Sequence, residues 1–213
     1  MHTECLPGKG LKVLKGLTGL LCRHDFVMAG GTALALQLGH RMSVDLDFFT
    51  EKPFSTDEIF RGIKKLNVSA EVMQEEKGTL TVIIDGVKTS FFYLPYPFLQ
   101  EKKSVFGAAV AGVLDIASMK IIAVCQRGAK RDFIDIYFIL KDIPFTKVAE
   151  NMLGRYGTER INPTHIGKSL LFFNDAEADS EPVYLGKHPD WESVKKFFRK
   201  NAKQMVWDLQ NVL

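Results

Sequence analysis

The chain has few cysteines, no long apolar run and little net charge. Its three cysteines, Cys5, Cys22 and Cys125, are far apart and form no C-x-x-C pair. This spacing excludes a disulfide framework and a zinc site built on paired cysteines, and it favours a reducing, cytoplasmic location. No apolar run reaches the roughly 18 residues that a membrane-spanning helix needs. The N-terminus also lacks the basic-then-apolar order of a signal peptide.

The composition is that of an ordinary globular protein. The chain has 213 residues, of which 46% are hydrophobic and 25% charged. This length suggests one domain, or one domain with an appended subdomain, and is sufficient for a sizeable core. The formal net charge is only +3, so composition alone does not indicate nucleic-acid binding.

Strand patterns dominate the first half of the chain and helix patterns the second. Strands are expected at residues 25–29, 43–50, 69–76, 79–85 and 87–94, with helices between them at 10–24, 32–39 and 55–66. Asp85-Gly86 predicts a hairpin, and residues 174–182 suggest an exposed acidic loop. From Leu114 onward, helices are expected at 114–128, 130–140, 145–157, 164–173 and 191–213. This order predicts an α+β protein, with a small mixed sheet in residues 1–110 and a helical part in residues 111–213.

Two carboxylates stand two residues apart in an otherwise apolar segment, "SVDLDFFT". On a strand, Asp45 and Asp47 point to the same face. Side-by-side carboxylates repel each other unless a cation joins them, and such hard oxygen ligands suit Mg²⁺. An isolated D-x-D is common, however, and the polar face of a half-exposed strand explains it equally well.

A glycine pair precedes these carboxylates. Gly30-Gly31-Thr32 lies between a predicted strand and a predicted helix, where backbone amides at the helix start can hold a phosphate. Glycine allows a tight turn and a close approach of the backbone to the phosphate. Taken alone, this segment is a simple strand-to-helix turn. Together with the D-x-D strand, it forms an arrangement that binds a triphosphate at one end and its metal at the other.

These two motifs resemble the polymerase-β type of nucleotidyltransferase, whose signature is G-[GS], a short gap and D-x-[DE]. More narrowly, "AGGTALALQLGHRMSVDLDFF" resembles the AbiEii family, nucleotidyltransferase-like toxins of bacterial abortive-infection and toxin–antitoxin systems. "ASMKIIAVCQRGAKRDFIDIYFIL", residues 117–140, resembles the second conserved block of that family. The resemblance covers roughly residues 10–145, and it implies a polymerase-β-type core.

The second block also makes chemical sense without the resemblance. Lys120 and Arg127 are seven residues apart, so they share a helix face and could balance triphosphate charge. A solvated basic face is the alternative. Asp132 and Asp135 share a face of the next helix and could orient these cations or lie near the metal; alternatively, Asp132 caps the helix after Gly128. The resemblance favours a role in the site for Lys120, Asp132 and Asp135.

Three further residues occupy the turn before the D-x-D strand. His40, Arg41 and Ser43 match an "HR-x-S" pattern in the AbiEii block. Their position predicts contacts to the nucleotide or its phosphates. The alternative is that they are ordinary turn residues.

The chain departs from the superfamily pattern at one point. Superfamily enzymes usually take a third carboxylate, the general base, from a neighbouring strand. Thr89 and Ser90 stand where this carboxylate is expected, and Asp85 belongs first to a turn. Three alternatives remain: the third acid is Asp132 or Asp135, two carboxylates suffice, or activity has been lost.

The resemblance implies an Mg²⁺-dependent nucleotidyltransferase that moves a nucleotide from an NTP to a hydroxyl of RNA, such as a tRNA end, or of a protein. It further implies a toxin-like role with a cognate antitoxin protein as partner. Two alternatives stay open. The chain could be a nucleotide-binding or interaction module without turnover, or an antidote transferase that modifies a partner toxin.

Overall fold

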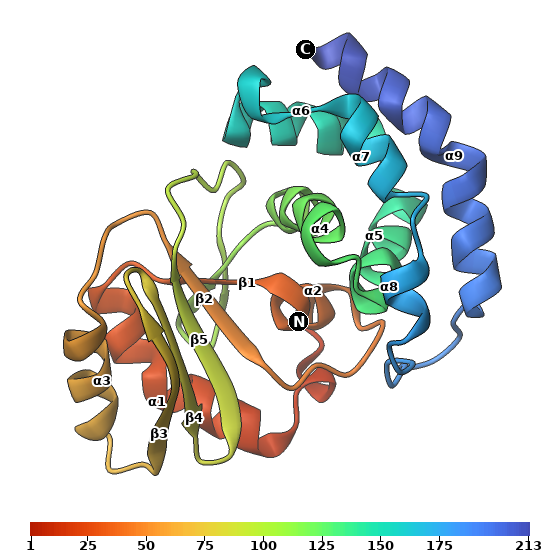
Figure 1. Cartoon of the computed structure of the whole chain (residues 1–213). Helices are drawn as coiled ribbons and strands as arrows, with labels where there is room; N and C mark the ends of the chain where they lie inside the picture. The colour runs from red at the N-terminus through yellow and green to blue at the C-terminus, as the bar shows by residue number, and fades with distance from the viewer. The chain divides into compact units, whose positions relative to one another are not determined.

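The computed structural model describes residues 1–213, which form two compact units. Unit 1 comprises Met1–Pro97 and Glu101–Ala111, and unit 2 comprises Phe98–Gln100 and Gly112–Leu213. Figure 1 shows strands with flanking helices in the first and helices alone in the second. None of the helices is both long enough and apolar enough to span a membrane.

Unit 1 is built around one mixed sheet of seven strands in the order β3-β4-β5-β2-β1-β7-β6. Its strands are β1 (Val27–Ala29), β2 (Leu46–Thr50), β3 (Ala70–Glu76), β4 (Thr79–Ile84), β5 (Val87–Tyr93), β6 (Lys103–Val105) and β7 (Ala108–Val110). Its helical segments are η1 (Thr3–Cys5), α1 (Gly8–Arg23), α2 (Gly30–Leu38) and α3 (Thr56–Lys64). Helices α1 and α3 lie together on one face of the sheet (Figure 1). The mixed sheet confirms the predicted α+β fold.

The central strand β2 separates a buried face from a more polar one. Leu46, Phe48 and Thr50 are buried, whereas Asp47 and Phe49 are half-buried on the opposite face. This alternation follows from the two-residue period of a strand. We call the side of the sheet from which Asp47 projects the Asp47 face.

Local sequence signals set several of the boundaries in unit 1. The backbone N–H of Glu58 donates to the Ser55 hydroxyl at 3.3 Å, which confirms the predicted cap of α3. Gly39 adopts φ 68° and ends α2, as expected for a glycine after the last helical turn. Asp85 and Gly86 have φ of 48° and 81°, which matches the turn of a tight hairpin between β4 and β5.

In three places the structure departs from the sequence analysis or adds to it. Strand β2 begins at Leu46, so Asp45 precedes the strand instead of lying on it. The apolar segment before α4 forms a short hairpin, β6–β7, whose turn residues Phe106 and Gly107 have φ of 49° and 85°. Strands of three residues are too short to give a clear periodic signal. The acidic residues of the expected loop are exposed as predicted, but part of the segment forms the helix α8 (Asn174–Glu177), and Glu177 and Glu181 pair with lysines.

Unit 2 consists of helices. They are α4 (Val113–Arg127), α5 (Lys130–Asp142), α6 (Phe145–Tyr156), η2 (Thr158–Arg160), α7 (Pro163–Ser169), α8 and α9 (Trp191–Val212). Helix α4 packs against α5, α6 and α7, and the long α9 packs along α5, α6 and α7 (Figure 1). The five helices that the sequence predicts after Leu114 are therefore present, although α7 ends at Ser169 and not at residue 173.

A buried carboxylate holds unit 2 together. Asp115 is fully buried and accepts N–H groups from Leu99 at 3.1 Å, Gln100 at 3.0 Å and the Asn151 side chain at 3.0 Å. The guanidinium of Arg155, also buried, donates to the Asp115 carbonyl oxygen at 2.6 Å. This network ties the segment Phe98–Gln100 to α4 and α6.

We predict that Asp115→Ala lowers the free energy of unfolding by about 3 kcal/mol or more, because it removes the carboxylate that lies 4.0 Å from the buried Nε of Arg155 and leaves two backbone amides without an acceptor. Urea unfolding measures the change. Asp142→Ala, at an exposed carboxylate on α5, is the matched control. Equal effects of the two substitutions would contradict the structural role of Asp115.

Candidate active site

The pairing of β1 with β2 brings the glycine turn next to the carboxylates. The two strands are antiparallel, and Ala29 lies opposite Asp47. Helix α2 starts at the next residue, Gly30, which has φ 77°. A Cβ atom on Gly30 would lie 3.1 Å from Asp47 Oδ2. Only glycine meets both the backbone and the space requirement here.

The start of α2 is open to an anion. Its N-cap residue, Ala29, has no polar side chain and makes no capping hydrogen bond to the first amides. These amides and the positive end of the helix dipole favour phosphate binding. The guanidinium of Arg41, which is buried, lies behind the turn, where a Cβ on Gly31 would be 2.6 Å from Arg41 Nη2. Arg41 thus places positive charge next to Gly31, while the carboxylate of Asp47 lies next to Gly30.

A buried hydroxyl fixes the carboxylate segment to the helix start. The Thr32 side chain hydrogen-bonds to Ser43 Oγ at 2.7 Å and to the carbonyl oxygen of Asp45. Thr32 is 1% exposed, so its hydroxyl is committed to these two bonds. Its backbone N–H is the group that lies at the helix start. His40, in the same turn, is also buried.

The carboxylate of Asp45 makes no hydrogen bond or ion pair within the chain. No group of three or more His, Cys, Asp or Glu residues is arranged to hold a metal ion. Mg²⁺ is usually held by one or two carboxylates together with substrate phosphates and water, and seldom by a cage made of protein alone. The oxygen donors Asp45 and Asp47, next to a helix start that suits a phosphate, fit a metal that arrives with a triphosphate.

The strand on the other side of β2 supplies no third acid. Asp47 lies opposite Ser90 of β5, whose hydroxyl is 3.3 Å from Thr81 Oγ1. Thr89 lies opposite the buried Leu46 and is itself buried. Asp85 is in the hairpin turn, and its carboxylate accepts the backbone N–H of Ser69 at 3.0 Å. The third carboxylate that the sequence lacks on the neighbouring strand is therefore also lacking at this position of the folded sheet.

In unit 2, four charged residues form a compact cluster. Lys120 Nζ on α4 lies 2.8 Å from Asp132 Oδ1 and 2.7 Å from Asp135 Oδ2 on α5. Both aspartates are fully buried. Arg127, which is half exposed, contacts Asp132 through Nε at 2.8 Å and Nη2 at 3.1 Å. The N-cap of α5 is Ala129, so Asp132 orients Lys120 and Arg127 and does not cap the helix.

The charges within this cluster balance. Burial raises the pKa of Asp132, but the Lys120 ammonium and the Arg127 guanidinium outweigh it and hold the pKa below the usual carboxyl range. Two cations and two carboxylates give a formal sum of zero. The cluster thus fixes the ammonium of Lys120 by two carboxylates, a strong constraint on its position.

Comparisons with known proteins match one family over most of the chain. Residues 12–102 and 65–213 match the profile of the nucleotidyl transferase AbiEii toxin family of type IV toxin–antitoxin systems. An uncharacterised protein of Aquifex aeolicus (strain VF5) is 40% identical over 199 residues, which are 92% of this chain and 95% of that protein.

Two solved structures share the fold. A protein of H. pylori described as a nucleotidyltransferase superposes with a TM-score of 0.57 at 17% identity, over 97% of this chain and 99% of that one. MenT4, a nucleotidyltransferase toxin of Mycobacterium tuberculosis H37Rv, gives a TM-score of 0.57 at 16% identity, over 93% and 91% of the two chains.

We predict that Lys120→Met lowers the free energy of unfolding by about 3 kcal/mol at neutral pH, because it leaves two buried carboxylates without their shared cation. The deficit should shrink in acid. The folded-state pKa of Asp132 is lowered in the parent, so its stabilising contribution is lost as pH falls through that pKa, whereas buried carboxylates without a cation protonate more readily.

Urea unfolding of the parent and the Lys120→Met protein at several pH values measures this difference. Lys141→Met, at an exposed lysine on α5, is the control. A deficit that stays constant down to the acid range would contradict the assigned ion pairs.

Proposed function

The chain belongs to the AbiEii family and is a nucleotidyltransferase, and from this premise we propose that it transfers a nucleotide from an NTP to a hydroxyl acceptor in an Mg²⁺-dependent reaction, as the toxin of a toxin–antitoxin system. The observation that carries the proposal is the contact between the two motifs. The glycine turn that starts α2 lies directly beside Asp47.

Asp45 and Asp47 would hold the metal. Both offer the carboxylate oxygens that Mg²⁺ prefers, and the carboxylate of Asp45 has no other partner in the chain. When bound, Mg²⁺ supplies positive charge that stabilises the triphosphate and the departing pyrophosphate. The hydrogen bond from Thr32 to the Asp45 carbonyl oxygen holds this carboxylate segment at the start of α2.

The glycine turn binds and orients the triphosphate. The amides of Gly31 and Thr32 at the start of α2 hold the β- and γ-phosphates, and Gly30 leaves room for them. The guanidinium of Arg41 adds positive potential from behind the turn. We assign Ser43 and His40 to shaping this turn, where Ser43 bonds to Thr32.

The acceptor hydroxyl attacks the α-phosphorus in line. A bond forms between the acceptor oxygen and this phosphorus, and the bond to the bridging oxygen of the pyrophosphate breaks. No carboxylate of β5 is available to take the hydroxyl proton. We therefore assign the proton to water, with rate enhancement arising from positioning and electrostatics.

We assign the cations of the unit 2 cluster a charge-balancing role. Arg127 is half exposed, while Asp132 and Asp135 hold the Lys120 ammonium in a fixed position within unit 2. The structure of the cluster supports an orienting role for the two aspartates. Family resemblance supports placing Lys120 in catalysis.

The experiment that tests this function measures label transfer and pyrophosphate release from each α-labelled NTP with Mg²⁺, using bulk tRNA or added protein as acceptor. We predict that Asp45→Asn and Asp47→Asn each lower transfer by about 10²-fold or more, because each removes charge that the metal requires. Asp57→Asn, at an exposed carboxylate of α3 paired with Arg61, is the matched control. Unchanged transfer in the two site variants would remove these residues from the reaction.

We also predict that Gly30→Ala raises the KM for NTP by about tenfold and destabilises the fold by about 1 kcal/mol, because the residue has positive φ and no space for a Cβ beside Asp47. Steady-state kinetics at varied NTP concentration checks the first effect, and thermal unfolding checks the second. Gly16→Ala is the control, since a Cβ there meets no atom within 4 Å. An unaltered KM in the Gly30→Ala protein would argue against phosphate binding at this turn.

The absence of an acid on β5 favours a second candidate, a nucleotide-binding module without turnover. Binding of NTP with Mg²⁺ but no release of pyrophosphate would support it. Expression in a host separates toxin from antidote. Slower growth of cells that express the chain alone supports the toxin role, whereas normal growth supports an antidote transferase or an inert binder.

A further inference from the structure

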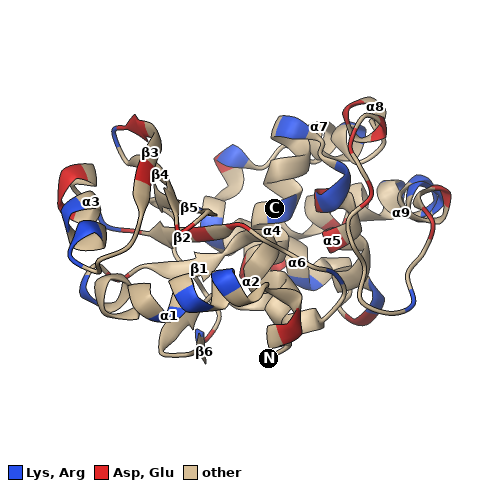
Figure 2. Ribbon diagram, turned by 90° about the horizontal axis from the view of Figure 1, so that it is seen from below, with Lys and Arg blue, Asp and Glu red and all other residues tan.

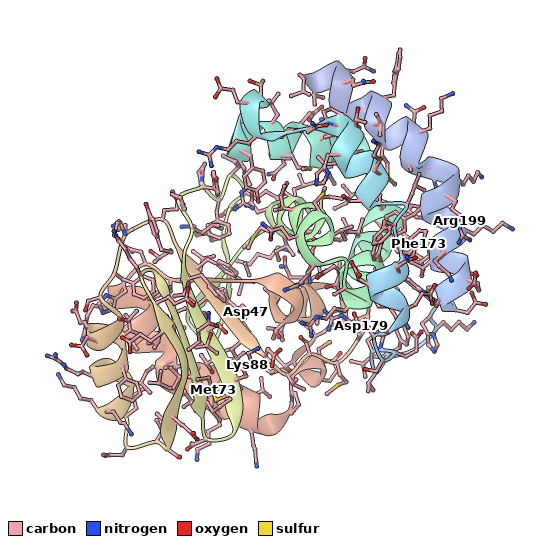
Figure 3. The ribbon with its side chains drawn as sticks, viewed as in Figure 1. Asp47, Met73, Lys88, Phe173, Asp179 and Arg199 are labelled. Atoms are coloured by element: carbon pink, nitrogen blue, oxygen red, sulfur yellow. The ribbon has the colours of Figure 1, made fainter.

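Lys88 on β5 lies beside the carboxylate pair, although its sequence context suggested no role. Strands β2 and β5 are parallel, with Leu46 opposite Thr89 and Asp47 opposite Ser90. Extending this register by one residue sets Asp45 level with Lys88. Side chains two residues apart on a strand share a face, so Lys88 projects from the Asp47 face (Figure 3).

The charges of Lys88 and Asp45 are both uncommitted. Lys88 is exposed, and its ammonium makes no hydrogen bond or ion pair within the chain. Asp45 likewise has no partner for its carboxylate. Opposite charges at neighbouring positions across a sheet can form a stabilising pair. Here each remains available for an external group, a cation at the carboxylate and an anion at the ammonium.

The surroundings of Lys88 restrict where an anion can bind. Among the strand residues that project from the Asp47 face, Lys88 is the only cation. Ile83 of β4 lies opposite Lys88, and Glu71 of β3 lies beyond Ile83. Figure 2 shows acidic residues along β3, the edge strand on that side. Their charge repels an anion from this edge and confines it to the strip between Lys88 and β2.

Sheet order identifies which substrate meets Lys88. Strand β2 lies between β1 and β5, and the phosphate-binding turn follows β1. The triphosphate and its leaving pyrophosphate are therefore on the β1 side of Asp47. In-line displacement requires the attacking hydroxyl to approach opposite the leaving group. The acceptor must then approach from the β5 side, where Lys88 projects.

We propose that Lys88 binds a backbone phosphate next to the attacking hydroxyl when the acceptor is a nucleic acid strand, and so positions the strand end. This inference rests on the proposed function. A lysine ammonium is a compact point charge that contacts a phosphate without reading the base. Lys88 thus contributes affinity and register for the strand end and no base preference.

The test is steady-state transfer to a short single-stranded RNA by the parent, Lys88→Ala and Lys88→Arg proteins. We expect Lys88→Ala to raise the KM for the RNA by about tenfold and to leave the KM for NTP unchanged. The slope of the logarithm of the RNA affinity against the logarithm of salt concentration should fall by about the contribution of one phosphate contact. Lys88→Arg should restore most of the affinity. Lys103→Ala is the matched control, because Lys103 is an exposed strand lysine at the opposite edge of the same sheet.

A second substrate locates the contact. Replacing the terminal phosphodiester of the RNA with a neutral methylphosphonate should raise the KM of the parent for the RNA by about the same factor as Lys88→Ala does. The same replacement should have little further effect on the KM of the Lys88→Ala protein. Independent, additive effects would overturn the contact. A rise in the KM for NTP instead would assign Lys88 to the triphosphate and would also overturn the proposal.

RNA binding by fluorescence anisotropy separates this inference from the proposed function. The parent could bind RNA but transfer no nucleotide to it. If Lys88→Ala then weakens RNA binding about tenfold, the phosphate contact would be supported and the transferase refuted. Transfer by the parent that Lys88→Ala leaves unchanged would refute the phosphate contact while supporting the transferase. A parent that neither binds RNA nor transfers to it would overturn both.

Discussion

The register between β1 and β2 is the constraint on which the site depends. The antiparallel pairing of Ala29 with Asp47 places the start of α2 beside a carboxylate. A shift of the β1–β2 register by one residue would turn Asp47 into the core and Phe48 toward solvent. The free energy gained by burying the large Phe48 side chain would then be lost. The packing of Leu46 and Phe48 therefore fixes the direction of Asp47. The burial of these two apolar side chains thus determines the geometry of the site.

The charged side chains of the candidate site are paired in unit 2, whereas two of those in unit 1 are not. In unit 2, Lys120, Asp132 and Asp135 are buried and neutralise one another, so their arrangement is rigid and costly to alter. In unit 1, the carboxylate of Asp45 and the ammonium of Lys88 have no partner in the chain. Charges that the fold leaves unpaired on one face are available to substrates, whereas those that it pairs internally position other groups.

Features that depend on neighbouring residues were predictable from the sequence. The cap at Ser55, the glycine that ends α2 and the Asp85-Gly86 hairpin are set within a few residues, and the structure confirms each. The glycine turn and the D-x-D segment could also be recognised in the sequence, since both patterns are short. The structure places Gly30 and Asp47 side by side. Their roles in catalysis are still predictions.

Features that depend on distant residues were not predictable. The contact between Arg41 and Gly31 and the bonds from Thr32 require the folded turn. The place of Lys88 next to Asp45 follows from strand order and register, which periodicity within one segment does not reveal. The lysine partners of Glu177 and Glu181, Lys195 and Lys130, were not predictable because they are far away in the sequence.

The central claim is that Asp45 and Asp47 form a metal site completed by a triphosphate at the glycine turn. Crystals grown with Mn²⁺ and a non-hydrolysable NTP, examined by anomalous diffraction, test it most directly. The account predicts a Mn²⁺ peak in contact with both carboxylates and with the triphosphate, whose β- and γ-phosphates lie at the start of α2. A triphosphate bound elsewhere, or metal that contacts neither aspartate, would contradict it.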